Sequence, residues 1–118
     1  MELMAKEFAA IPPPSDARRL GEIRESSKWI RQSISADFIV RSTAADVEQH
    51  YNRMVASRGW KPAMTESKAE FGRRVSRFCK GDLDLVLEIP DLTATPLRYY
   101  LGVQWEGGPH YKSGCSSG

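Results

Sequence analysis

The pattern of apolar and polar positions predicts one amphipathic helix over residues 44–58. Thr43 can cap its start, and Asp46 three residues later completes a pair typical of a capped helix. Gly59 suits the left-handed conformation that ends many helices, and we expect Trp60 to fold back onto the last turn. The apolar positions follow the three- and four-residue spacing of a helix and are Val47, Tyr51, Met54 and Val55.

Strand-forming residues precede and follow this helix. Residues 27–41 predict one long bent strand or two short strands, and Leu20 and Ile23 indicate a turn or short strand before them. After the helix, apolar and polar residues alternate in three further segments, a pattern typical of half-buried strands. Short connections between these segments predict an antiparallel meander. Its three strands span residues 71–80, 83–89 and 97–105.

The first strand of the meander contains a conflict of parity. Phe71 and Val75 would point to one face of the sheet, whereas Phe78 would point to the other. A β-bulge inserts one residue and reverses the alternation that follows it. We therefore expect a bulge near Arg77.

These elements predict an α+β fold in which one main helix packs on an antiparallel sheet as a second layer. We expect the folded domain to span residues 18–106. Residues 1–17 are interpreted as a flexible arm, because Pro12, Pro13 and Pro14 favour an extended polyproline conformation. Residues 107–118 have the Gly- and Ser-rich composition of a flexible tail.

Composition is consistent with a single globular domain. The chain has 118 residues, of which 41% are hydrophobic and 27% are charged. The formal net charge of +2 is too small to demand a polyanionic partner. No apolar run approaches the roughly 20 residues of a membrane-spanning helix. The first residues lack the apolar core of a secretory signal, which indicates a cytoplasmic protein or one whose leader was removed.

Two cysteines leave two readings open. Cys79 lies near the end of a predicted strand and Cys115 lies in the tail, so a disulfide between them would fasten the tail to the domain. We expect instead a half-buried thiol at Cys79 and a free thiol in the tail.

Metal and cofactor chemistry is not predicted. The chain has no Cys-x-x-Cys or His-x-x-x-His spacing and no glycine-rich phosphate loop, so we expect neither a metal nor a cofactor. An enzyme would have to use Asp82, Asp84 or His50. We expect His50 to lie on the solvated side of the helix. The two aspartates should lie on the solvent face of their strand, neutralised by Arg74 and Arg98.

The basic strand at residues 73–80 favours a second hypothesis, nucleic-acid binding. Arg73, Arg74 and Arg77 could contact phosphates, and Tyr100 could stack on a base. Because the adjacent strand is acidic, charge pairing within the sheet is the stronger interpretation.

Tyr100 shares its parity with Arg98 and Gln104, so all three should project from the sheet face that the helix leaves open. Tyrosine and arginine are enriched in protein contact sites. The candidate interaction surface consists of Arg74, Arg77, Arg98, Tyr100 and Gln104.

A family resemblance extends this reading. The capped helix ending in Tyr51-x-x-x-Val55-x-x-x-Gly59-Trp60, after a proline-containing arm, resembles small domains of bacterial envelope lipoproteins and periplasmic proteins. The resemblance implies a noncatalytic accessory module, tethered near a membrane by its N-terminus. Our leading hypothesis is thus a protein-interaction module of the cell envelope with an unidentified protein partner.

Overall fold

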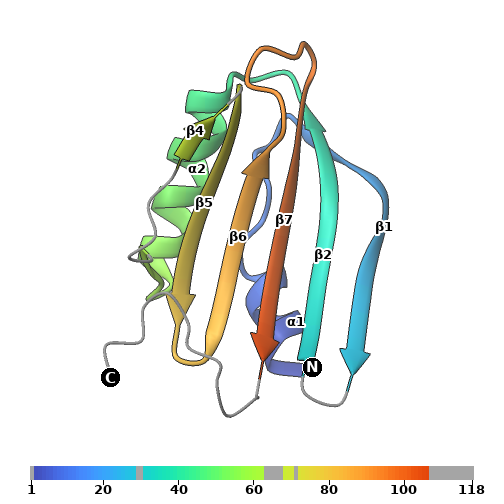
Figure 1. Cartoon of the computed structure of the whole chain (residues 1–118), viewed down its shortest axis with the longest axis vertical. Helices are drawn as coiled ribbons and strands as arrows, with labels where there is room; N and C mark the ends of the chain where they lie inside the picture. Colours follow the sequence, from blue (N-terminus) through green and yellow to red (C-terminus); the bar gives the residue numbers. More distant parts are fainter. Residues whose placement is uncertain (1, 29–30, 63–67, 71, 107–118) are drawn as a thin grey trace.

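An antiparallel sheet with two helices on one of its faces forms the protein (Figure 1). The computed structural model describes residues 2–28, 31–62, 68–70 and 72–106. The strands follow the spatial order β1-β2-β7-β6-β5-β3, and β4 also pairs with β5. In chain order the elements are α1 (Glu2–Ala9), β1 (Ala17–Lys28), β2 (Arg31–Val40), α2 (Ala44–Ser57), β3 (Lys61–Pro62), β4 (Lys68–Glu70), β5 (Arg73–Lys80), β6 (Leu83–Ile89) and β7 (Leu97–Glu106). The predicted α+β class is confirmed, although a second helix, α1, joins the helical layer.

Alternation along the central strands sorts their side chains between two faces. One set points toward α1 and α2 and forms the hydrophobic core, as expected for a sheet covered on a single side. The strand residues of this core are Ile34, Ala36, Phe38, Val40, Phe78, Leu83, Leu85, Leu87, Ile89, Leu97, Tyr99, Leu101 and Val103.

Both ends of α2 form as the sequence predicts. The backbone N–H of Asp46 donates to the Thr43 hydroxyl oxygen at 3.2 Å. At the other end Gly59 adopts a φ of +86°, which other residues reach only with strain. The N–H of Trp60 then donates to the carbonyl of Val55 at 2.9 Å, closing the last turn. The helix is therefore fixed in length by its own sequence.

A pair of buried tyrosines joins α2 to the centre of the sheet. The hydroxyls of Tyr51 and Tyr99 are 2.6 Å apart and share a hydrogen bond. Phe38 stacks on Tyr99 with ring centroids 5.1 Å apart. Burial raises the pKa of both hydroxyls above the ordinary tyrosine value, so both remain neutral hydrogen-bonding groups.

The N-terminal segment differs from the flexible arm predicted over residues 1–17. It forms α1, whose Met4 and Phe8 are buried in the core together with Ile11, while Leu3 remains 61% exposed. An isolated helix this short is marginal in water. Burial of its apolar side against the sheet supplies the stability that the local sequence lacks.

Two polar contacts secure this segment. Lys80 on β5 donates to a carboxylate oxygen of Glu7 at 2.9 Å. His50 on α2 lies within hydrogen-bond distance of the Pro12 carbonyl, with 2.7 Å between Nε2 and the oxygen. The prediction of a solvated His50 is therefore wrong: the side chain is half-buried and holds the proline segment against α2.

The first hairpin is longer than the sequence predicts. The strand expected over residues 27–41 corresponds to β2, and the segment before it forms the twelve-residue edge strand β1. Most β1 side chains are exposed at the edge of the sheet, and few of them are apolar. The segment therefore lacks the apolar stripe from which a strand is predicted. The register shifts between Leu20 and Arg24, where Gly21 takes a φ of +76°. This irregularity conceals the alternation by which a strand is recognised.

The bulge expected near Arg77 is absent. β5 pairs with β6 in continuous register from Arg74 to Lys80, so Phe78 faces the helices and Val75 faces the other side of the sheet. Phe71, which suggested the conflict, lies outside the described residues. The apolar Val75 belongs to the face without helices.

The packing of α1 predicts opposite outcomes for two substitutions in the same helix. Phe8→Ala should lower the free energy of unfolding by about 3–5 kcal/mol, because it opens a cavity in the core. Leu3→Ala should change it by less than about 0.5 kcal/mol, because Leu3 is exposed. Urea unfolding followed by circular dichroism measures both. Equal effects of the two substitutions would contradict the docking of α1.

Candidate interaction surface

The sheet face opposite the helices, here called the open face, carries the second set of alternating side chains. In the described part of the chain no helix covers it (Figure 1). It is a mixed surface, because half-buried aliphatic groups lie among charged ones. The central positions of the open face are Arg18, Leu20, Arg24, Ser33, Ser35, Asp37, Ile39, Arg73, Val75, Arg77, Cys79, Asp84, Val86, Glu88, Arg98, Tyr100, Gly102 and Gln104.

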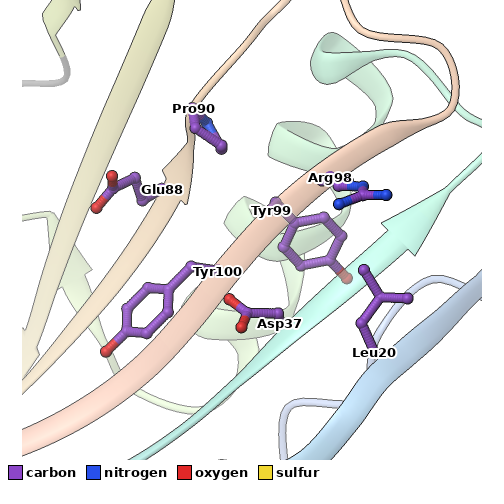
Figure 2. A pocket seen from close by; sticks show the side chains of 7 residues that line it. All are labelled: Leu20, Asp37, Glu88, Pro90, Arg98, Tyr99 and Tyr100. Carbon is purple, nitrogen blue, oxygen red and sulfur yellow. The ribbon is translucent and has the colours of Figure 1, made fainter.

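Tyr100 occupies the middle of this face beside a hollow of about 590 Å³. Figure 2 shows its ring with Glu88 and Asp37 on its two sides. The ring lies across Gly102, since a Cβ atom built on Gly102 would stand 2.8 Å from the Cζ of Tyr100. Glycine at position 102 therefore lets the ring lie flat on the sheet. The hollow is lined by Leu20, Asp37, Glu88, Pro90, Arg98, Tyr99 and Tyr100.

Two ion pairs flank Tyr100. In the register of the sheet Tyr100 lies between Asp37 on β2 and Glu88 on β6. Arg24 donates to Asp37 at 2.7 Å, and Arg73 lies 2.8 Å from Glu88. The hydrogen bond to Asp37 also raises the pKa of Arg24. The Arg24 guanidinium carbon is 5.9 Å from the centroid of the Tyr100 ring, within the range of a cation–π contact.

Four of the five residues of the predicted surface share the open face. Arg77, Arg98, Tyr100 and Gln104 lie there, as the alternation of their strands indicates. The exception is Arg74, which points toward the helices and binds both carboxylate oxygens of Glu48 on α2, at 2.7 and 2.9 Å. It does so because it shares the parity of the buried Phe78.

The basic strand is thereby divided between two faces. Arg73 and Arg77 lie on the open face, whereas Arg74 lies on the opposite face and forms an ion pair with Glu48. The three arginines proposed for phosphate binding therefore cannot contact one strand of nucleic acid together.

The carboxylates and the histidine considered for catalysis are not brought together. Asp82 is exposed in the turn between β5 and β6, and His50 lies on the helical side of the sheet. Asp84 is on the open face but only 7% exposed, so the prediction that it is solvated is wrong. Its register neighbours are Cys79 on β5 and Gln104 on β7. Arg74, expected to neutralise these aspartates, pairs with Glu48 instead. Glu88 pairs with Arg73.

Neither a metal site nor a membrane-spanning helix occurs among the residues that the structure describes. They contain no group of three or more His, Cys, Asp or Glu side chains suited to a metal ion. Within the same ranges, no helix is long and apolar enough to cross a membrane.

Cys79 forms a disulfide and is almost fully buried. The expectation of a free thiol at this position is therefore wrong. Cys115, the other cysteine of the chain, lies outside the described residues.

Comparison of the chain with protein-family models, with curated proteins and with solved structures gave no match.

Sequence reasoning missed three residues that shape the surface around Tyr100. Arg24 lies on β1, which the sequence does not predict as a long strand. Asp37 lies within the predicted strand over residues 27–41, but its partner Arg24 is on β1, so their pairing could not be predicted. Gly102 did give a signal, because an isolated glycine inside an alternating strand often marks a close approach by another group. Here that group is the neighbouring tyrosine ring.

Gly102→Ala should displace the Tyr100 ring while leaving the fold intact. The new methyl group would occupy the space of the ring, but alanine is favoured over glycine in a strand by about 0.5–1 kcal/mol. We expect NMR to show the loss of nuclear Overhauser contacts between the Tyr100 ring and residue 102, with unfolding free energy changed by less than about 1 kcal/mol. In a Tyr100→Ala background the same substitution should stabilise the protein. Unchanged ring contacts in the single variant would contradict this packing.

Proposed function

We propose that the protein is a noncatalytic interaction module that binds a protein partner through the open face. One observation carries the proposal: an aromatic side chain lies flat beside a hollow, among arginines and half-buried aliphatic groups, on a sheet face that no described helix covers. Tyrosine and arginine anchors of this kind supply much of the binding energy in protein interfaces.

The aliphatic residues of the open face support a protein partner. Leu20, Ile39, Val75 and Val86 are each half-buried, so a covering surface would remove their remaining apolar area from water. The flanking ion pairs already neutralise Asp37 and Glu88, which lowers the cost of covering them. A partner could therefore bury these aliphatic side chains without burying an unpaired carboxylate at Asp37 or Glu88.

Nucleic-acid binding has weaker support. A base stacked on Tyr100 would bring its phosphates past carboxylates on both neighbouring strands. Arg74, one of the three arginines that suggested this function, is bound to Glu48 on the other side of the sheet.

We further propose that the module works in the cell envelope of a bacterium. The disulfide at Cys79 supports this location, because disulfides persist in oxidising compartments such as the periplasm. The resemblance of the segment from Tyr51 to Trp60 to envelope domains points the same way.

Site-specific photocrosslinking in the source cell tests the proposed surface. A benzophenone amino acid replaces Tyr100 in one variant and Arg53, exposed on α2, in a matched control. We expect one discrete protein adduct from position 100 and none of the same mass from position 53. Adding Arg98→Glu should remove the adduct, because Arg98 borders the same hollow.

Three outcomes would overturn the proposed function: no protein adduct at position 100, an identical adduct from position 53, or an adduct that consists of nucleic acid. Circular dichroism of each variant confirms that the fold is retained.

A further inference from the structure

Arginine is in excess on the open face. Among its acidic side chains, Asp37 and Glu88 are already bound by arginines. By contrast, Arg18, Arg77 and Arg98 are exposed and engage no carboxylate in the described part of the chain. A partner that covers this face therefore meets unneutralised positive charge.

We propose that the open face binds an extended acidic segment of a protein partner, in which two carboxylates flank an apolar residue packed on Tyr100. This inference rests on the proposed function and specifies the chemistry of the partner.

The register of the sheet places the unpaired arginines on both sides of Tyr100 along β7. Arg98 and Arg18 lie in one row with Ile39 between them. On the other side of Tyr100, Gly102 on β7 pairs with Val86 on β6, which pairs with Arg77 on β5. Arg77 is therefore in the row of Gly102, two strands away from it. The two rows are four residues apart along the strand, or about 13 Å at 3.3 Å per residue.

An extended chain covers that length in four residues and presents every second side chain to the same face. A carboxylate at its first position would meet the row of Arg98 and Arg18. A carboxylate at its fifth position would reach toward Arg77, which lies two strands, or about 10 Å, to the side of β7. The third position would lie over Tyr100 and the hollow beside it. The complementary pattern is acidic-x-apolar-x-acidic.

This arrangement favours a peptide over a nucleic-acid strand. A peptide can be neutral at the middle position, where Asp37 and Glu88 flank the ring. A nucleic-acid strand carries a phosphate at every step and would place charge there too. The spacing of charge on the open face thus separates the two classes of partner.

NMR titration of the isotope-labelled full chain tests the proposal with defined probes. The first probe is a nine-residue capped peptide centred on Glu-Ser-Leu-Ser-Glu, and the second replaces both glutamates by lysine. We expect the acidic peptide to shift amide signals of β7 and its neighbours around Tyr100, and the lysine peptide to leave them unchanged. Added salt should weaken binding, because the contacting charges are exposed.

Substitution identifies the groups responsible. Arg18→Gln and Arg98→Gln should each weaken binding of the acidic peptide about two- to five-fold, and together about ten-fold. Arg53→Gln on α2 should have no effect, which controls for net charge. The amide spectrum of each variant reports whether the fold is retained.

Absence of binding by the acidic peptide, or equal binding of the lysine peptide, would overturn the inference. It would leave the proposed function intact if the crosslink at position 100 persists. Tighter binding of a single-stranded oligothymidylate in a parallel titration would contradict both.

Discussion

Tyr51 and Tyr99 share a hydrogen bond in the core, and Phe38 stacks against Tyr99. The arrangement of the whole molecule depends on this contact. It seats α2 over the central strands and fixes the parity of β7, since an adjacent residue in a strand must point to the opposite face. With Tyr99 buried among the helices, Tyr100 is obliged to lie on the open face. A shift of β7 by one residue would exchange the two rings and dismantle both the core and the surface.

Coverage of a single face gives the sheet two different roles. One face is filled by aromatic and aliphatic side chains and by the docked helix α1. The open face has too few apolar side chains to form a second core. It nevertheless carries several half-buried aliphatic side chains among its charged ones. Arg24 and Arg73 hold the carboxylates of Asp37 and Glu88 close to the sheet, and Tyr100 lies flat between them. Contacts within the sheet therefore hold the side chains around Tyr100 in a fixed arrangement.

Local sequence signals predicted the elements that local interactions stabilise. The cap at Thr43, the stop at Gly59 and the alternation of β7 each involve residues close together in the chain, and the projection of Tyr100 follows from that alternation. Distant contacts account for what could not be predicted. Helix α1 is stable because it is buried against strands far along the chain, and β1 is a charged edge strand without an apolar stripe.

The position of Arg74 illustrates the same limit within the candidate site. Its parity depends on which face Phe78 occupies, and the apolar Val75 gave the opposite signal. The parity of Phe78 turns Arg74 inward, and Glu48 on α2 supplies the carboxylate that makes this charged position tolerable. A sequence pattern does not contain that information, because the pairing joins residues 26 positions apart.

Residue-resolved hydroxyl-radical footprinting of the native protein tests the central claim most directly. Neighbouring tyrosines on one strand should behave oppositely: Tyr100 should be oxidised readily, while Tyr99 and its partner Tyr51 should be protected until the protein unfolds. Oxidation of Tyr99 in the native state at a rate equal to that of Tyr100 would show that β7 does not divide the molecule into a covered and an open face.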